Sequence, residues 1–247
     1  MPDLFIEEWG EGVPVVLVHG SLATGRDEWQ AQQTLADEGY RLLVLDRRGY
    51  GNSPAAVGED FVRDAEDIAD VLGDGAHVVA HSYGGLGAMF AAAQRQEAIL
   101  SLALLEPPAF TMTADNDAAR LVERVRSIWE DDVSDIVWLE RFLESVGTEP
   151  EDLPPHVLTE TARMVPLARN CRPPWDREPP VAELADAPFP RLVVSGGHSR
   201  GFDAICDELA DKIKARRAVV AGAGHEIQFA GAPINAELLN LWESAEH

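Results

Sequence analysis

Short apolar runs that alternate with helical patterns constrain the fold of this chain more than any other feature. The runs are Leu4–Trp9, Val15–Val18, Leu42–Leu45, His77–Ala80, Leu102–Leu105, Leu192–Val194 and Ala218–Val220. Runs this short are typical of strands that are largely buried, and the segments between most of them have helical spacing, as in Trp29–Asp37, Glu59–Leu72 and Asp203–Ile213. The pattern predicts an α/β fold in which a mostly parallel, twisted sheet carries helices on both faces.

The alternation of strands and helices stops after Leu102–Leu105. The next 60 or so residues carry two or three helical patterns with no strand between them, and a proline-rich stretch follows. We therefore expect an α/β core formed by residues 1–108 and 187–247, with residues 109–186 inserted as a helical lid. Insertions of this kind often cover active sites.

A serine lies at the sharpest predicted turn of the core. Ala80-His81-Ser82-Tyr83-Gly84-Gly85 joins the strand His77–Ala80 to an alanine-rich helical segment. A strand-to-helix turn of this kind lifts a serine hydroxyl above the sheet edge, and it needs small residues two positions before and after the serine. Ala80 and Gly84 meet that requirement. The segment is a G-x-S-x-G nucleophile elbow with alanine as its first residue, so Ser82 is the candidate nucleophile.

A second loop follows the buried strand Val15–Val18, as His19-Gly20-Ser21. Acyl transfer needs two N–H donors aimed at the oxygen that becomes negative. We expect one from Tyr83, directly after the nucleophile, and the other from Ser21, with Leu22 as the alternative. His19 is interpreted as a residue that packs the loop.

A histidine in a glycine-rich loop near the end of the chain is the candidate general base. Gly222-Ala223-Gly224-His225 follows the strand Ala218–Val220. Because a serine hydroxyl is a poor nucleophile at neutral pH, it needs a base that titrates near that pH, and histidine does. We predict that His225 takes this role.

The chain resembles the α/β-hydrolase superfamily through these motifs and one more. Asp46-Arg47-Arg48-Gly49-Tyr50-Gly51-Asn52-Ser53 is similar to the family's D-x-R-G-x-G-x-S loop, and four motifs stand in the family's order. The resemblance implies a triad in the order nucleophile, acid, histidine. The family's usual acid position, in a G-x-x-D loop after Leu192–Val194, is Ser199 here. Glu106, at the end of another core strand, is the preferred acid, and Asp203 is the alternative.

These residues predict a serine hydrolase for a small-to-medium, mostly apolar carboxylic ester or lactone. Carbon–carbon bond hydrolases, thioesterases and perhydrolases on the same scaffold retain the serine, so these reactions remain open, as does a non-hydrolytic ligand sensor. In the predicted lid, Trp175 and Met164 are candidates for contact with a substrate. We expect no metal and no cofactor, because the sequence has neither metal-ligand spacing nor a dinucleotide fingerprint.

The composition narrows the range of partners. The 43 acidic and 20 basic residues give a net charge of −23, which disfavours binding to nucleic acids or anionic membranes. No apolar run is long enough to cross a bilayer, and no apolar signal core follows the amino terminus. The two cysteines, Cys171 and Cys206, are isolated, which suits a reducing compartment. We therefore expect a cytoplasmic monomer or homodimer that acts on a small molecule.

Overall fold

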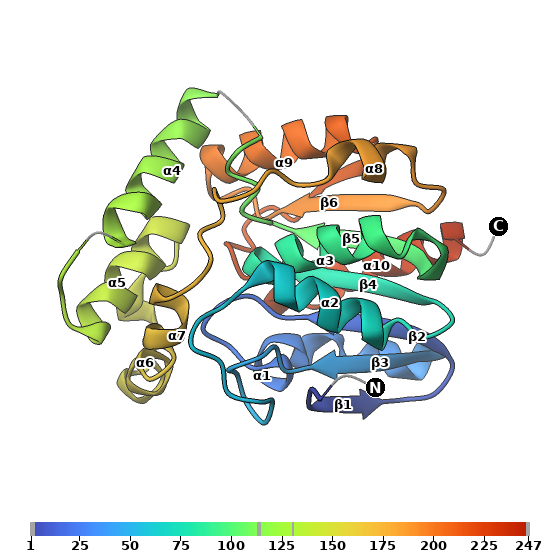
Figure 1. Ribbon diagram of the computed structural model, residues 1–247, viewed down its shortest axis with the longest axis horizontal. Helices are drawn as coiled ribbons and strands as arrows, with labels where there is room; N and C mark the ends of the chain where they lie inside the picture. The colour runs from blue at the N-terminus through green and yellow to red at the C-terminus, as the bar shows by residue number, and fades with distance from the viewer. Residues whose placement is uncertain (1–2, 113–114, 130, 246–247) are drawn as a thin grey trace.

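A single twisted sheet runs through the molecule, in the computed structural model that describes residues 3–112, 115–129 and 131–245 (Figure 1). Within these residues the strand order is β1-β3-β2-β4-β5-β6-β7. The strands are β1 (Ile6–Trp9), β2 (Val13–Val18), β3 (Tyr40–Leu45), β4 (Ala76–His81), β5 (Ile99–Leu105), β6 (Arg191–Ser195) and β7 (Arg216–Val219). Among the strands that the structure describes, only β1, paired with β3, runs antiparallel to its neighbour. The predicted mostly parallel α/β fold is confirmed.

Helices cover both faces of this sheet. One layer consists of α2 (Phe61–Val71), α3 (Ser82–Gln94), α8 (Val181–Asp186) and α9 (Arg200–Lys212), and the other of α1 (Gly25–Trp29), the 3₁₀ helix η1 (Gln30–Glu38) and α10 (Ala232–Ala245). Short 3₁₀ helices also occur as η2 (Gln96–Ala98) and η4 (Ile227–Ala230). No helix in the described part of the chain has the length and apolar character needed to cross a membrane.

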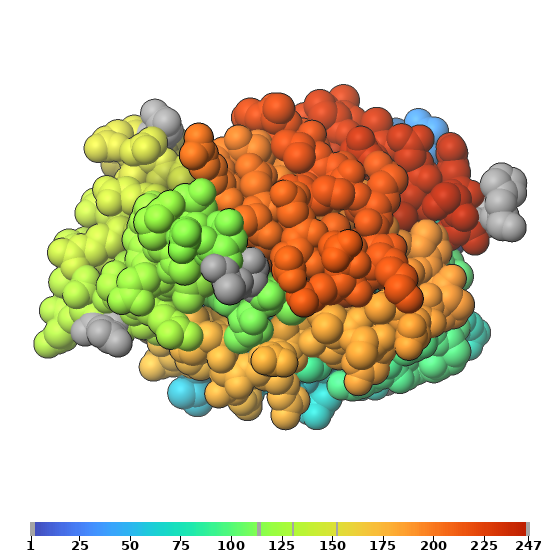
Figure 2. All heavy atoms as spheres, turned by 90° about the horizontal axis from the view of Figure 1, so that it is seen from above, coloured from blue at the N-terminus to red at the C-terminus, as the bar shows by residue number. Residues whose placement is uncertain are grey.

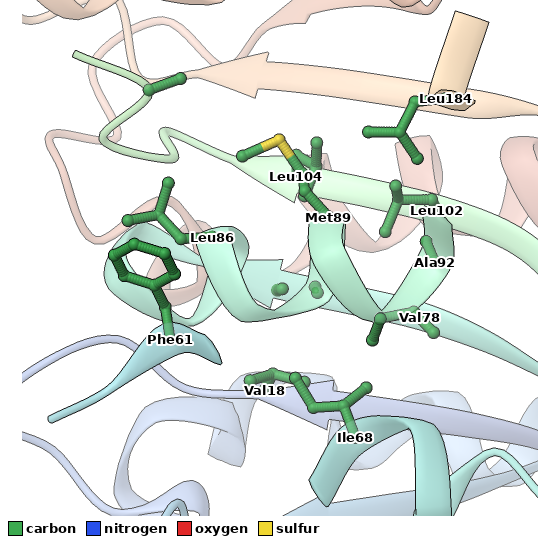
Figure 3. Close-up of a cluster of buried hydrophobic side chains, with 14 of the residues drawn as sticks. Val18, Phe61, Ile68, Val78, Leu86, Met89, Ala92, Leu102, Leu104 and Leu184 are labelled. Atoms are coloured by element: carbon green, nitrogen blue, oxygen red, sulfur yellow. The ribbon is translucent and has the colours of Figure 1, made fainter. Parts of the chain in front are cut away.

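The two faces of the central strands build two separate cores. In β2, Val16 and Val18 pack on the side of α2 and α3, whereas Val15 and Leu17 pack on the side of α1 and α10. Figure 3 shows the first core, where Val18 and other strand residues meet side chains of the covering helices. All four of these β2 residues are fully buried. This two-sided burial explains why Val15–Val18 is an uninterrupted apolar run in the sequence.

The helix expected at Trp29–Asp37 begins earlier and is divided. Thr24 is its N-cap and accepts a hydrogen bond at Oγ1 from the amide of Asp27, so α1 starts at Gly25. After Trp29 the segment continues as the 3₁₀ helix η1 and ends at Gly39, which has the left-handed conformation (φ 89°) expected of a helix-ending glycine.

Between β5 and α8 the chain forms a helical cluster beyond one end of the sheet (Figure 1). It contains α4 (Asn116–Trp129), α5 (Asp135–Val146), η3 (Pro150–Asp152), α6 (Pro155–Ala162) and α7 (Val165–Arg169). The cluster has a small core of its own around the fully buried Trp138, and its α4 also packs against α9, as Figure 2 shows. The predicted insertion 109–186 also includes α8, but Leu184 of α8 is buried in the main core.

Candidate active site

The turn between β4 and α3 holds Ser82 in a strained backbone conformation. Ser82 has a φ of 46°, in the left-handed region that non-glycine residues seldom adopt. Ala80 is fully buried, and a Cβ added to Gly84 would lie 2.4 Å from the carbonyl oxygen of His19. Small residues on either side of the serine are therefore a steric requirement, as the sequence indicates.

Ser82, His225 and Glu106 form one continuous chain of hydrogen bonds. The Ser82 hydroxyl donates to Nε2 of His225 over 3.0 Å, and Nδ1 of His225 donates to Oε2 of Glu106 over 2.7 Å. The second bond requires the histidine proton on Nδ1, which leaves Nε2 free to accept from the serine. The structure thus brings together the preferred nucleophile, base and acid from three separate segments.

The position of Glu106 follows from the pairing of β4 with β5. His81, directly before the serine, is paired with Leu105, directly before the glutamate. Glu106 is fully buried and, like Ser82, has a positive φ, 41°. Its amide donates a hydrogen bond to the carbonyl oxygen of Val194 in β6 over 2.9 Å. The backbone of Glu106 is therefore held by β6 on one side and by the pairing of β4 with β5 on the other.

Asp203, the alternative acid, lies elsewhere. Its carboxylate accepts a hydrogen bond from Ser195 Oγ over 2.5 Å and forms an ion pair with Arg217 at 3.5 Å. Ser199, at the family's usual acid position, is the N-cap of α9, where its hydroxyl accepts from the amide of Phe202. Of the two carboxylates proposed from the sequence, Glu106 is the one that contacts His225.

A second histidine, His198, binds the same carboxylate. Its Nε2 donates to Oε2 of Glu106 over 2.9 Å, while Oε1 accepts from the amide of Gly196 over 2.7 Å. Burial alone would raise the pKa of Glu106, but the hydrogen bonds from His198 and His225 outweigh it and lower the pKa to about 2. Glu106 is therefore an anion throughout the neutral range. No local sequence pattern indicates this contact, although His198 stands in the loop where the family's acid is expected.

The loop after β2 holds the Ser21 amide in a defined direction. The guanidinium of Arg47 donates to the carbonyl oxygens of His19 and Gly20 over 2.9 and 2.8 Å. Since the C=O and N–H of a trans peptide point in opposite directions, the Ser21 N–H points away from Arg47. The amide of Tyr83 lies in the first turn of α3, where amides have no acceptor within the helix. Ser21, Ser82 and Tyr83 line the same cavity, so the two residues expected to supply the N–H donors lie beside the nucleophile.

Leu22, the alternative donor, already has an acceptor for its amide. Its N–H donates to the hydroxyl of Tyr50 over 3.1 Å, and that hydroxyl donates to Glu59 over 2.9 Å. Glu59 also accepts from the Ser21 hydroxyl, and it pairs with Arg47 at 2.5 Å. Arg47 and Tyr50, both in the motif that begins at Asp46, thus support the loop that carries Ser21.

A buried pair, Glu28 and His81, connects this loop to the base. Glu28 accepts from the Gly20 amide over 3.0 Å and from Nδ1 of His81 over 3.1 Å, and Nε2 of His81 donates to the carbonyl oxygen of His225 over 3.0 Å. Burial alone would lower the pKa of His81, but the charge of Glu28 outweighs it and raises the pKa. Both ring nitrogens face oxygen acceptors, which favours a protonated His81.

Two cavities meet at Ser82. The larger one, of about 480 Å³, is lined by His225 and by residues of α5 and α6, and it includes Met164. The smaller one, of about 30 Å³, is lined by Tyr83, by Glu59 and mainly by apolar side chains. Trp175, the other predicted substrate contact, lines neither of them, because its ring packs on Trp129 and on the guanidinium of Arg126.

Among the described residues, Glu106, His198 and His225 are also a group that could bind a metal ion. One potential ligand atom from each lies within 4.8 Å of the others. The two hydrogen bonds from histidines to Glu106 account for this proximity. Each of them needs a proton on the histidine nitrogen that faces the carboxylate.

Comparison with known proteins agrees with this architecture. The model of the Alpha/beta hydrolase family matches residues 15–237. The chain belongs to the alpha/beta hydrolase family. A solved alpha/beta hydrolase from Sphaerobacter thermophilus is 26% identical, with 96% of each chain covered and a TM-score of 0.70. A thermophilic esterase from Thermogutta terrifontis has the same fold, with 24% identity, 99% of this chain and 94% of that one covered, and a TM-score of 0.73.

Curated relatives match this alpha/beta hydrolase over shorter segments. A non-heme chloroperoxidase from Kitasatospora aureofaciens is 44% identical over 89 residues, 34% of this chain and 32% of its own. A bifunctional esterase/perhydrolase from Acinetobacter calcoaceticus is 39% identical over 90 residues, 34% of this chain and 33% of its own. The matched segments span about a third of the length of these relatives.

Proposed function

We propose that this alpha/beta hydrolase is a serine hydrolase that cleaves carboxylic esters, including cyclic ones, through an acyl-enzyme. The observation that carries the proposal is the hydrogen-bond chain from Ser82 through His225 to Glu106, with distances of 3.0 and 2.7 Å. A serine hydroxyl bonded to a histidine that is oriented by a buried carboxylate is the arrangement that nucleophilic catalysis requires.

In the first half of the reaction, Ser82 Oγ attacks the ester carbonyl carbon while Nε2 of His225 takes the hydroxyl proton. Glu106 holds the histidine ring and stabilises the imidazolium that forms. The carbonyl oxygen becomes negative and accepts hydrogen bonds from the amides of Ser21 and Tyr83. His225 then gives its proton to the departing alkoxide, so that an alcohol leaves and the acyl group stays on Ser82.

In the second half, a water molecule replaces the alcohol. His225 takes a proton from the water, and the hydroxide oxygen attacks the acyl carbon of the acyl-enzyme. The proton then passes from His225 to Ser82 Oγ as the bond to the acyl group breaks, which releases a carboxylic acid. No cofactor takes part in this proposed reaction.

Turnover of a series of 4-nitrophenyl esters, from acetate to decanoate, tests the proposal. We expect the wild-type protein to release 4-nitrophenol, and Ser82→Ala to lower kcat by at least about 10³-fold, because the Ser21 and Tyr83 amides alone leave only residual rate enhancement. Circular dichroism should show the same fold for both proteins. A folded wild-type protein that hydrolyses none of these esters, or an unchanged rate in Ser82→Ala, would contradict the proposal.

A second reaction deserves the same assay because a relative is named a bifunctional esterase/perhydrolase. Hydrogen peroxide in place of water would attack the same acyl-enzyme and release a peroxycarboxylic acid. We expect such a reaction to depend on Ser82 as ester hydrolysis does.

A ligand sensor is the alternative to an enzyme. Such a protein would bind an ester without consuming it, and its affinity for the ester would be the same in Ser82→Ala.

A further inference from the structure

The two cavities that meet at Ser82 differ sharply in size and chemistry. Ser82 lines both of them, together with Ser21, Phe142 and Val146, so it lies at their junction. The larger cavity holds about 480 Å³, and the smaller about 30 Å³. An ester bound with its carbonyl carbon at Ser82 Oγ must place its acyl part in one compartment and its alcohol part in the other.

The position of the base decides which part lies where. His225 has to reach the oxygen of the departing alcohol, and His225 lines the larger compartment. Tyr83, whose amide is the expected donor to the carbonyl oxygen, lines the smaller compartment, and His225 does not. The alcohol therefore lies in the larger compartment, and the acyl chain extends into the smaller one.

The smaller compartment accepts very few atoms. Its volume of about 30 Å³ is about a sixteenth of the 480 Å³ of the larger compartment, so only a short acyl chain fits between its walls. Its far walls are apolar and closely packed. Val125 and Phe202 are 2% and 1% exposed, and Phe110 lies beside the ring of Phe202 with centroids 6.4 Å apart. Closely packed side chains of this kind move little, so a longer acyl chain would fit only by displacing them.

The larger compartment has the size of a pocket for a whole small molecule. Apolar residues of the helical cluster, including Leu153 and Val157, form part of its wall. Its wall also includes the carboxylates of Asp27, Glu28, Glu160 and Glu226, and the ring of His81, whose Nδ1 is bonded to Glu28. Among the described residues, neither lysine nor arginine lines it. An alcohol part that fits here is bulky and either uncharged or positively charged.

We propose that the substrate is an ester of an acetyl- or propionyl-sized acyl group with a bulky, uncharged or cationic alcohol. The proposal rests on the serine hydrolase function proposed above and narrows it to short acyl chains.

The first test uses one leaving group and varies only the acyl chain, as 4-nitrophenyl acetate, propionate, butyrate and hexanoate. We expect kcat/KM for acetate or propionate to exceed that for hexanoate at least ten-fold, since one surplus methylene in a filled apolar pocket already costs 10-fold or more. Equal or better turnover of hexanoate would overturn this inference and leave the hydrolase function standing. Absence of turnover for every ester, in folded protein, would overturn both.

Two matched valine variants locate the acyl chain. Val125 lines only the smaller compartment, and Val157 lines only the larger one. We expect Val125→Ala to raise the ratio of butyrate to acetate turnover at least five-fold, whereas Val157→Ala leaves this ratio within two-fold of the wild type. The opposite pattern would show that the acyl chain lies in the larger compartment and would overturn the proposal.

A pair of acetate esters tests the charge of the alcohol part. The 3-acetoxy-N,N,N-trimethylanilinium cation and the 3-acetoxybenzoate anion share the acyl group and differ in charge. We expect kcat/KM for the cation to exceed that for the anion at least ten-fold, after correction for their uncatalysed rates. Equal or faster turnover of the anion would contradict the charge that we assign to the alcohol part.

Discussion

Replacement of Glu106 by glutamine tests the site most directly, because an amide cannot satisfy all three donors that the carboxylate satisfies. Oε2 accepts from His225 and His198, and Oε1 accepts from the amide of Gly196. If the glutamine oxygen takes the position of Oε2, its NH₂ group faces the N–H of Gly196. If the oxygen faces Gly196 instead, the NH₂ group faces both histidines.

The second orientation forces His225 to accept a hydrogen bond at Nδ1, so its proton moves to Nε2 and faces Ser82. A histidine in that tautomer cannot take the serine proton. Loss of the correct tautomer in a triad of this type costs about 10⁴-fold in kcat, which corresponds to about 5.5 kcal/mol of transition-state stabilisation. We therefore expect Glu106→Gln to hydrolyse 4-nitrophenyl acetate about 10⁴-fold more slowly than the wild type at pH 8.

Asp203→Asn is the matched control, since it makes the same chemical change in the carboxylate that contacts Ser195 and Arg217. We expect its kcat to stay within about three-fold of the wild type, because the carboxylate of Asp203 contacts Ser195 and Arg217 and not His225. Circular dichroism and thermal unfolding should show that both variants are folded. A folded Glu106→Gln with more than a tenth of wild-type activity would refute the reasoning, as would an equally large loss in Asp203→Asn.

Three further outcomes follow from the buried charges around the site. Arg47→Met leaves Glu59 and Asp64 without their buried cation, so the free energy of unfolding should fall by about 3–5 kcal/mol in urea titrations; a loss below 1 kcal/mol would contradict this. The pKa of Glu106 falls on folding from 4.5 to about 2, so its ionisation contributes stability that is present above pH 4.5 and lost as the pH falls toward 2. This contribution to the free energy of unfolding is about 3 kcal/mol. The difference in the free energy of unfolding between the wild type and Glu106→Gln should therefore shrink by up to that amount between pH 6 and pH 2.5. A difference that stays constant over this range would disprove the lowered pKa of Glu106. Ser21→Ala removes the hydroxyl that bonds Glu59 but keeps the amide, so kcat/KM for 4-nitrophenyl acetate should fall less than about ten-fold; a 10³-fold loss would place the hydroxyl in the chemistry.

The strands and the nucleophile turn could be predicted because each depends on local pattern. β2 and β4 are largely buried on both faces, so each contains a short apolar run, Val15–Val18 and Val78–Ala80, that can be located directly in the sequence. The turn at Ser82 requires small neighbours for steric reasons, and small residues in that spacing are visible in the sequence. The helix after Trp29 was less predictable because its start depends on the cap at Thr24 and its second half is 3₁₀.

The contacts that complete the site depend on segments far apart in the chain, which no local pattern reveals. The choice between Glu106 and Asp203 follows from which carboxylate the sheet places against His225, 119 residues beyond Glu106. The hydrogen bond of His198 to Glu106 joins residues 92 positions apart. Trp175 lines neither cavity because its ring packs on Trp129 and Arg126 of α4, a contact between segments that are 46 and 49 residues apart in the chain.

The pairing of β4 with β5 also has a consequence for how the site is assembled during folding. The nucleophile and the acid belong to one β-α-β unit, Ala76–Glu106, whose two strands are direct neighbours. The base comes from a segment near the other end of the chain and joins them only when β6 and β7 have been added to the sheet. Because the base joins through contacts of high sequence separation, recovery of activity during refolding should report the docking of the carboxyl-terminal segment and should lag behind signals from the central strands.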